Sequence, residues 1–222
     1  DRPSQTMRIL IDGVERASAS LTATIVGVEA HLVRVETDTA GGFPRFTIVG
    51  LPDSAVRESE ARIRAALRNC GYSFPAQNVT VNLAPADMKK EGSGFDLPIA
   101  LGVLAGMGEL EGARLENFMF LGELSLDGLL RPVRGALSIA SKARELGITN
   151  LVVPLQNGRE AAAVEGVSVY ALKSLPEALE LLRTWPSRYA SVTQPRYTYL
   201  VRGKAVEGDN YVESLSHQQV PK

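Results

Sequence analysis

Ser93 lies in the segment of this chain whose residue types come closest to those of a reactive loop. Residues 89–94 read Lys-Lys-Glu-Gly-Ser-Gly, between a predicted strand and an apolar predicted helix. Gly92 and Gly94 allow the backbone to approach a ligand closely, ahead of a helix N-terminus. The segment is therefore typical of a nucleophile loop or an anion-binding loop. The alternative is a solvated turn in which Asp96 caps the next helix.

A Ser–Lys pair is the catalytic arrangement that these residues could form. Burial lowers the pKa of a lysine amine and lets it act as a base toward a serine hydroxyl. Lys142 stands in a neighbouring predicted helix and could serve Ser93 in this way. Arg144 and Glu145 follow it closely, which favours instead a lysine on a solvated helix face.

Other enzyme chemistries lack the residues that they need. The chain has two histidines and one cysteine, so neither a Ser–His triad nor a His/Cys metal site is expected. No segment matches the Gly-x-x-x-x-Gly-Lys-[Ser/Thr] phosphate loop, so the sequence predicts no ATP site of that kind. Asp53, Asp87 and Asp96 stand at predicted turn or helix starts, where capping is the expected role.

Four basic residues stand in predicted loops that lead into helices: Lys89, Lys90, Arg131 and Arg134. Gathered on one surface, they would form a patch that contacts DNA or a neighbouring subunit. The alternative is scattered surface charge, because the formal net charge is -1 and the chain has no overall positive field.

Hydrophobic periodicity predicts alternating strands and helices, an order typical of a layered α/β or α+β domain. Gly50-Leu-Pro-Asp53 is predicted to end a strand and to begin a helix with Asp53 as its N-cap. The nearly uncharged segment 97–107 is predicted to be a buried central helix. The expected strands cover residues 22–26, 31–37, 45–49, 78–83, 118–126, 151–154, 167–172 and 197–201, and the expected helices cover residues 54–70, 97–107, 134–146, 157–164 and 175–182.

The length of 222 residues, with 45% hydrophobic and 22% charged residues, fits one sizeable folded domain with a smaller attachment. Residues 1–20 are assigned to an N-terminal extension, and residues 184–222 to a polar tail or linker with one docked strand. The lone Cys70 excludes an internal disulfide and fits a reducing cytoplasm. No apolar run has the ~20 residues of a membrane span, so no membrane association is expected.

Several short motifs stand out between Leu21 and Leu182. They are Phe46-Thr-Ile-Val-Gly-Leu-Pro-Asp53, Val56-Arg-Glu-Ser59, Val79-Thr-Val-Asn-Leu-Ala-Pro-Ala-Asp87, Lys90-Glu-Gly92, Phe95-Asp-Leu-Pro-Ile-Ala-Leu-Gly102, Phe120-Leu-Gly-Glu-Leu-Ser-Leu126 and Arg131-Pro-Val-Arg-Gly135. Together they resemble the N-terminal domain of the bacterial Mg-chelatase-like ATPases called YifB or ComM.

The resemblance implies a Lon-protease-like, ribosomal protein S5 domain 2-like fold, a two-layer α/β (α+β) arrangement that would span residues 21–183. It also implies that the domain precedes an AAA+ ATPase module. That module would bring ATP and Mg, assemble with sister subunits into a hexameric ring, and serve DNA processing in competence. The domain itself would then act in assembly or in contact with DNA or another substrate, with no cofactor of its own.

The same resemblance bears on catalysis. Lon-type proteases carry a serine in a Lys-Asp-Gly-Pro-Ser-Ala-Gly loop and a lysine after a Pro-Val-Gly-Gly turn. Laying Lys90-Glu-Gly92 on that loop puts Gly94 at the nucleophile position, with Ser93 one residue early. Laying Pro132-Val-Arg-Gly135 on the turn puts Leu137 at the lysine position. The domain is therefore expected to be non-catalytic, and the alternative is a peptidase with a relocated Ser93–Lys142 pair.

Overall fold

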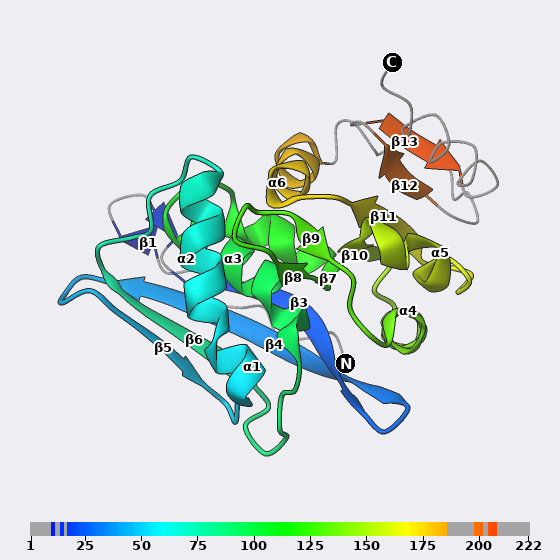
Figure 1. The fold of residues 1–222 in the computed structure, drawn as a ribbon, viewed down its shortest axis with the longest axis horizontal. Coiled ribbons are helices and arrows are strands. Elements are labelled where there is room, and N and C mark those ends of the chain that lie inside the picture. Colours follow the sequence, from blue (N-terminus) through cyan, green and yellow to red (C-terminus); the bar gives the residue numbers. More distant parts are fainter. Residues whose placement is uncertain (1–9, 12–13, 16, 186–197, 202–203, 208–222) are drawn as a thin grey trace.

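A seven-stranded mixed sheet forms the centre of the chain (Figure 1). The computed structural model describes residues 10–11, 14–15, 17–185, 198–201 and 204–207. The strand order is β11-β10-β7-β3-β4-β6-β5, in which β4 is antiparallel to β3 and β6 and the other neighbours are parallel. The strands are β3 (Ala17–Val26), β4 (Glu29–Ala40), β5 (Arg45–Val49), β6 (Asn78–Ala84), β7 (Met119–Phe120), β10 (Asn150–Pro154) and β11 (Ser168–Leu172).

Helices and short hairpins complete the described residues. The α-helices are α1 (Ser54–Arg57), α2 (Ser59–Asn69), α3 (Asp96–Gly106), α4 (Ala136–Glu145), α5 (Gly158–Ala161) and α6 (Leu175–Thr184). The 3-10 helices are η1 (Ser93–Phe95), η2 (Gly112–Asn117) and η3 (Leu155–Asn157). The short antiparallel pairs are β1 (Leu10–Ile11) with β2 (Val14–Glu15), β8 (Glu123–Leu124) with β9 (Leu130–Arg131), and β12 (Thr198–Val201) with β13 (Lys204–Glu207).

The helices cover the sheet unevenly. Buried side chains of α1, α2, α3 and α6 share a core cluster with Val152 and Tyr170. Those of α4 and α5 share a second cluster with Val153 and Ala171, which point to the opposite face because successive strand residues alternate. The expected α/β class is confirmed. The expected two-layer arrangement holds only around β5 and β6, because helices cover both faces of β10 and β11.

Local geometry divides or moves several expected elements. The expected helix over residues 54–70 is two helices, α1 and α2, which meet at Glu58. The expected strand over residues 118–126 is divided into β7 and β8, because β8 leaves the main sheet to pair with β9. The expected helix over residues 157–164 shortens to α5. Strand β3 begins at Ala17 and buries Ser18, Ala19 and Ser20, so part of the predicted N-terminal extension belongs to the folded sheet.

Small residues allow α3 to pack closely against β3 and β4. A Cβ atom added at Gly102 would lie 2.4 Å from Thr37 Oγ1, and one at Gly106 would lie 2.6 Å from Thr39 Cγ2. The Ser18 hydroxyl donates to the Gly102 carbonyl at 3.1 Å, and the Thr39 hydroxyl donates to the Gly106 carbonyl at 3.1 Å. These contacts fix the helix that directly follows the glycine-rich loop.

Arg114 closes the C-terminal end of α6. Its Nη1 donates to the carbonyls of Leu182 and Arg183, both at 2.8 Å, and to that of Trp185 at 2.6 Å. The Trp185 ring packs edge-on against Phe118, with ring centroids 5.0 Å apart. The packed core therefore extends to Trp185, slightly beyond the expected domain end.

Further expectations concern the ends of the chain and possible membrane or metal binding. The expected strand over residues 197–201 corresponds to β12, which covers Thr198–Val201, while the other expectations for residues 1–9, 186–197 and 208–222 fall outside the described residues. Within the described ranges, no helix has the length and hydropathy that crossing a membrane requires. The same part of the chain holds no group of three or more His, Cys, Asp or Glu side chains that could bind a metal.

Candidate functional site

A cavity of about 570 Å³ opens where the glycine-rich loop meets β3 and the turn before α4. Its volume is in the range of pockets that hold small ligands, roughly 300–1,000 Å³. Ser93 and Gly94 are in its wall, so it lies where the sequence favours chemistry. Its apolar lining includes Ala23, Ile25, Phe95, Leu121, Val133 and Ile139, and its charged lining consists of Asp53, Glu91, Glu123 and Arg134.

Lys90 holds the glycine-rich loop from the inside and is fully buried. Its Nζ donates to the carbonyls of Pro85 and Met88, at 2.7 Å from the latter. Its backbone N–H donates to the Leu51 carbonyl at 3.1 Å, and its carbonyl accepts from the Asp53 N–H at 3.0 Å. Burial lowers the pKa of the Lys90 amine. The expectation that Lys90 belongs to an exposed basic patch is wrong, because loop carbonyls surround its amine.

Asp53 joins the glycine-rich loop to the start of α1. Its Oδ1 accepts from the Val56 N–H at 2.8 Å, which confirms the predicted N-cap. Its Oδ2 accepts from the Gly92 N–H at 3.1 Å. On the other side of the loop, the Glu91 N–H donates to the Thr24 hydroxyl of β3 at 3.4 Å. The loop is therefore held on one side by the residue that caps α1 and on the other by β3.

Asp96 is a buried ion-pair residue, and the interpretation of it as a helix cap is wrong. Nε and Nη2 of Arg62 donate to its two carboxylate oxygens at 2.6 and 2.9 Å, and the Leu124 N–H donates to Oδ2 at 3.0 Å. Burial raises the pKa of the Asp96 carboxyl, and the hydrogen bonds from Arg62 oppose that rise. One feature of the sequence could have indicated the role of Asp96, because it is the one acidic residue of an otherwise uncharged helix. No such feature distinguishes Arg62, which stands in an arginine-rich segment.

The structure does not bring Ser93 and Lys142 together. The Ser93 hydroxyl donates to Oε2 of Glu123, a residue to which the sequence assigned no role. Lys142 pairs with Glu145 at 2.7 Å and is not among the residues that line the cavity. Leu137, at the predicted lysine position, is also outside that lining and is 47% exposed. The serine hydroxyl therefore faces a carboxylate, and an amine takes no part in this contact.

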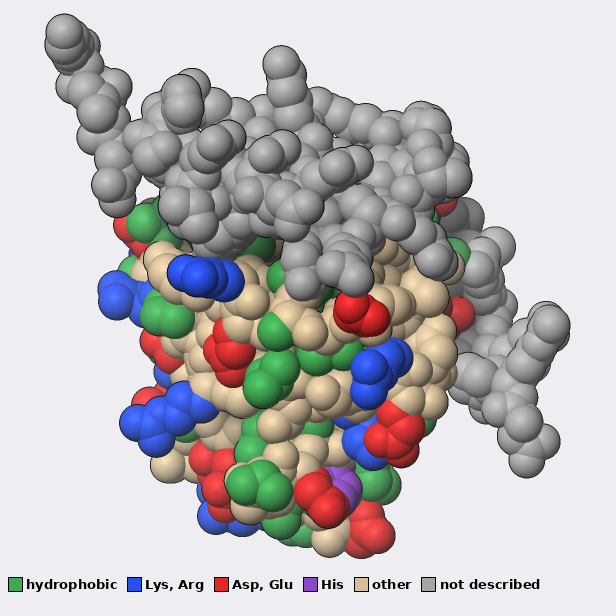
Figure 2. Space-filling view, turned by 90° about the vertical axis from the view of Figure 1, so that its right-hand side faces the viewer, with side chains coloured by type: hydrophobic (Ala, Val, Ile, Leu, Met, Phe, Trp, Pro, Cys, Tyr) green, Lys and Arg blue, Asp and Glu red, His purple; other side chains and the backbone are tan. Residues whose placement is uncertain are grey.

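The other predicted basic residues lie at the surface. Lys89 pairs with Glu91 at 2.8 Å, and this hydrogen bond raises the pKa of the Lys89 amine. Arg131 and Arg134 are exposed, and Arg134 lines the cavity. Figure 2 shows acidic and basic side chains interspersed over the described part of one face of the molecule. Scattered charge describes that face better than a single basic patch.

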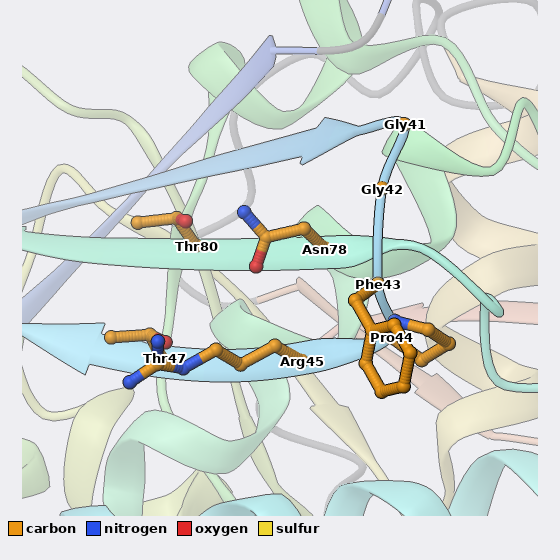
Figure 3. A pocket seen from close by; sticks show the side chains of 8 residues that line it. All are labelled: Gly41, Gly42, Phe43, Pro44, Arg45, Thr47, Asn78 and Thr80. Carbon is orange, nitrogen blue, oxygen red and sulfur yellow. The ribbon is translucent and has the colours of Figure 1, made fainter.

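A second hollow, of about 660 Å³, lies beside β5 and β6 at the end of the sheet (Figure 3). Arg45 and Thr47 of β5 and Asn78 and Thr80 of β6 project from the strands beside the turn at residues 41–44. Arg45 is the one charged residue in its lining, which contains no carboxylate, histidine or lysine. The glycine-rich cavity, where several ionisable groups converge, is therefore the better candidate for a functional site.

The glycine-rich cavity is better equipped for binding than for acyl transfer. Nucleophilic catalysis by a serine requires a base within hydrogen-bond reach of its hydroxyl, usually an imidazole or an amine. No residue in the described lining is a lysine, histidine or cysteine. The lining combines apolar side chains with carboxylates, a guanidinium and a hydroxyl, which are groups that orient a bound ligand.

Comparisons with known proteins agree on one family. The model of the family described as subunit ChlI of Mg-chelatase matches residues 35–157. Competence protein ComM of Haemophilus influenzae is 42% identical over 157 residues, which cover 71% of this chain and 31% of that protein. The uncharacterized protein YifB of Salmonella typhimurium is 43% identical over 143 residues, which cover 64% of this chain and 28% of that protein.

A weaker likeness connects the chain to a protease. Lon protease 2 of Bacillus subtilis is 22% identical over 129 residues, which cover 57% of this chain and 23% of that protein. The chain spans less than a third of the length of each of these three relatives. Since the family model covers more than half of its residues, the chain belongs to the family of subunit ChlI of Mg-chelatase, in which it is similar to ComM and YifB.

Proposed function

We propose that this chain is the non-catalytic N-terminal domain of a longer Mg-chelatase-like AAA+ ATPase, and that it engages a substrate or a neighbouring subunit. The parent protein would bind ATP and Mg in its own ATPase module and form a ring, the hexamer that the family resemblance implies. The similarity to ComM and YifB, which are more than three times as long as the matched region, supports a parent of this kind.

One observation carries the non-catalytic part of the proposal. The hydroxyl of Ser93 donates to a carboxylate, Glu123, in a cavity whose described lining holds no amine or imidazole. The position expected for the nucleophile is Gly94, which has no side chain to acylate. A Cβ atom at that position would lie 2.9 Å from Leu121 Cδ1, so a larger residue would require this side chain to move.

The test is hydrolysis and covalent labelling of the purified chain. We expect casein cleavage and labelling by a fluorophosphonate probe to be indistinguishable from a blank, because the partner of the Ser93 hydroxyl is a carboxylate, a weaker base than an imidazole or an amine. Ser93→Ala and Lys142→Ala should therefore leave both casein cleavage and probe labelling unchanged. Labelling of Ser93, or cleavage that either substitution abolishes, would replace this proposal with the relocated Ser93–Lys142 peptidase.

DNA contact is a second candidate function, favoured by the exposure of Lys89, Arg131 and Arg134. Replacing these three residues by alanine should weaken binding of a mixed-sequence duplex. It should also reduce the slope of log affinity against log salt by up to about 2.7, at about 0.9 for each phosphate contact. Alanine at three other exposed arginines, Arg57, Arg68 and Arg144, serves as the matched control. Equal affinities and slopes in the two triple variants would remove DNA contact through this group.

A further inference from the structure

We propose that the glycine-rich cavity accepts an arginine side chain from an extended peptide segment of a protein partner. The inference rests on the proposed non-catalytic role and names the partner that this cavity would engage. It is drawn from the shape and the charge of the cavity wall.

The apolar part of the cavity lining suits the aliphatic part of a long side chain. Ile25 of β3, Leu121 after β7 and Val133 before α4 contribute apolar surface from three separate elements. Burying methylene groups against such surface is favourable, at roughly 25 cal/mol per Å². The volume of about 570 Å³ exceeds what one side chain fills, which leaves room for the flanking peptide backbone.

The charged groups of the wall favour a cation at the tip of that side chain. Three carboxylates, those of Asp53, Glu91 and Glu123, line the cavity against one guanidinium, that of Arg134, so its wall carries two more negative than positive groups. A guanidinium pairs with a carboxylate through parallel hydrogen bonds and is more weakly hydrated than an ammonium group, so it is the cation better suited to these carboxylates.

Glu123 is the carboxylate best placed to receive the guanidinium. Asp53 already accepts backbone N–H groups with both oxygens, and Glu91 pairs with Lys89. Glu123 accepts the Ser93 hydroxyl on Oε2, and among the described residues no hydrogen-bond donor contacts its Oε1. Ser93 is in this view a positioning residue that orients the carboxylate.

An anionic ligand fits the same cavity poorly. The N-terminus of α4 borders the cavity and would attract an anion, but the Leu137 N–H already donates to Oε1 of Glu160 at 3.0 Å. A carboxylate guest would also meet the three acidic side chains of the wall, and like charges repel. Charge complementarity therefore selects a basic guest.

Peptide titration followed by ¹⁵N–¹H correlation spectra tests the proposal on the 222-residue chain. The probes are the capped pentapeptides Ala-Ala-X-Ala-Ala in which X is arginine, norleucine or glutamate. We expect the arginine peptide to bind most tightly and to shift the amide signals of Gly92, Gly94 and Gly135, which border the cavity. Norleucine keeps an aliphatic stem without the charge, so its peptide should bind about tenfold more weakly.

Substitutions assign the binding to the cavity. Glu123→Gln should weaken the arginine peptide by about fivefold to tenfold and leave the norleucine peptide unchanged. Glu145→Gln, which neutralises an exposed carboxylate outside the lining, is the matched control and should change neither affinity. If Glu123→Gln loses its dispersed spectrum, Glu91→Gln provides the second variant, with a smaller expected loss.

The outcomes separate this inference from the proposed function. Equal affinities for the three peptides, a preference for glutamate, shifts remote from the three glycines, or no shifts at all would overturn the arginine site and leave the non-catalytic role intact. New signals of cleaved peptide would instead overturn the non-catalytic role. A fourth peptide, in which X is lysine, tests the guanidinium specificity: binding as tight as that of the arginine peptide would show that charge alone decides and would contradict that specificity.

Discussion

Replacing Arg62 by alanine is expected to lower the free energy of unfolding by about 3–5 kcal/mol, the usual effect of removing one partner of a buried ion pair. The Asp96 carboxylate would remain fully buried, with the Leu124 N–H as its remaining hydrogen-bond donor. Urea unfolding of the purified chain measures the change. Arg68→Ala on the same helix removes an exposed arginine and should change stability by less than about 0.5 kcal/mol.

The deficit in unfolding free energy caused by Arg62→Ala should become smaller as the pH falls. Burial raises the pKa of Asp96 in the folded chain, so the folded state holds a proton at a pH where the unfolded state has lost it. Acidification toward the ordinary value of 3.8 therefore favours the folded state through this group. Without Arg62 the pKa of Asp96 rises further, so acidification stabilises the folded variant more than it stabilises the folded wild type. A deficit that is constant with pH would contradict this account of Asp96.

Replacing Lys90 by alanine is expected to lower the free energy of unfolding by about 2–4 kcal/mol. The substitution removes the hydrogen bonds from the amine to the Pro85 and Met88 carbonyls, and a hydrogen bond that involves a charged group contributes about 1.5–3 kcal/mol. Lys90→Met keeps an apolar stem of similar length and should cost less than Lys90→Ala, since it loses the hydrogen bonds but less packing. Equal unfolding energies for the wild type and both variants would show that the amine does not support the loop.

The pH dependence of Lys90 has the opposite direction to that of Asp96. Burial lowers the pKa of the amine, so between its folded value and its ordinary value of 10.5 the unfolded state holds more protons. Stability should therefore rise with pH in that alkaline window. Lys90→Met lacks the titrating group, and its stability should rise less than that of the wild type in the same window. A steeper rise in Lys90→Met would contradict the direction of the shift.

Much of the fold follows from local patterns that the sequence displays. The sequence predicts a helix over residues 54–70, and its apolar residues Val56, Ile63, Ala66 and Leu67 are all buried, although α1 holds the first and α2 the other three. Asp53 has the residue type and position of an N-cap, and it caps α1. Both predictions depend on residues close together in the chain, for which periodicity and hydrogen-bond chemistry are sufficient.

The candidate site was predicted less completely, because its decisive contacts join distant segments. Lys90 looks like a surface lysine among polar neighbours, but the loop carbonyls that enclose its amine bury it. Asp96 looks like a helix cap, but Arg62 approaches it from α2. Glu123 gained a role only when the fold placed it beside Ser93. A charged residue reveals its partner in a sequence only when that partner stands at a regular local spacing.

The sequence by itself determined the α/β class, most strand and helix positions, and the absence of a Ser–His or phosphate-loop motif, because these depend on residue type and short-range spacing. Only the tertiary structure decided which charges are buried, which helices cover which face, and that a cavity forms beside the glycine-rich loop. These properties depend on which side chains meet across segments far apart in the chain. Whether a side chain is buried or paired depends on these contacts between distant segments, and no single segment shows them.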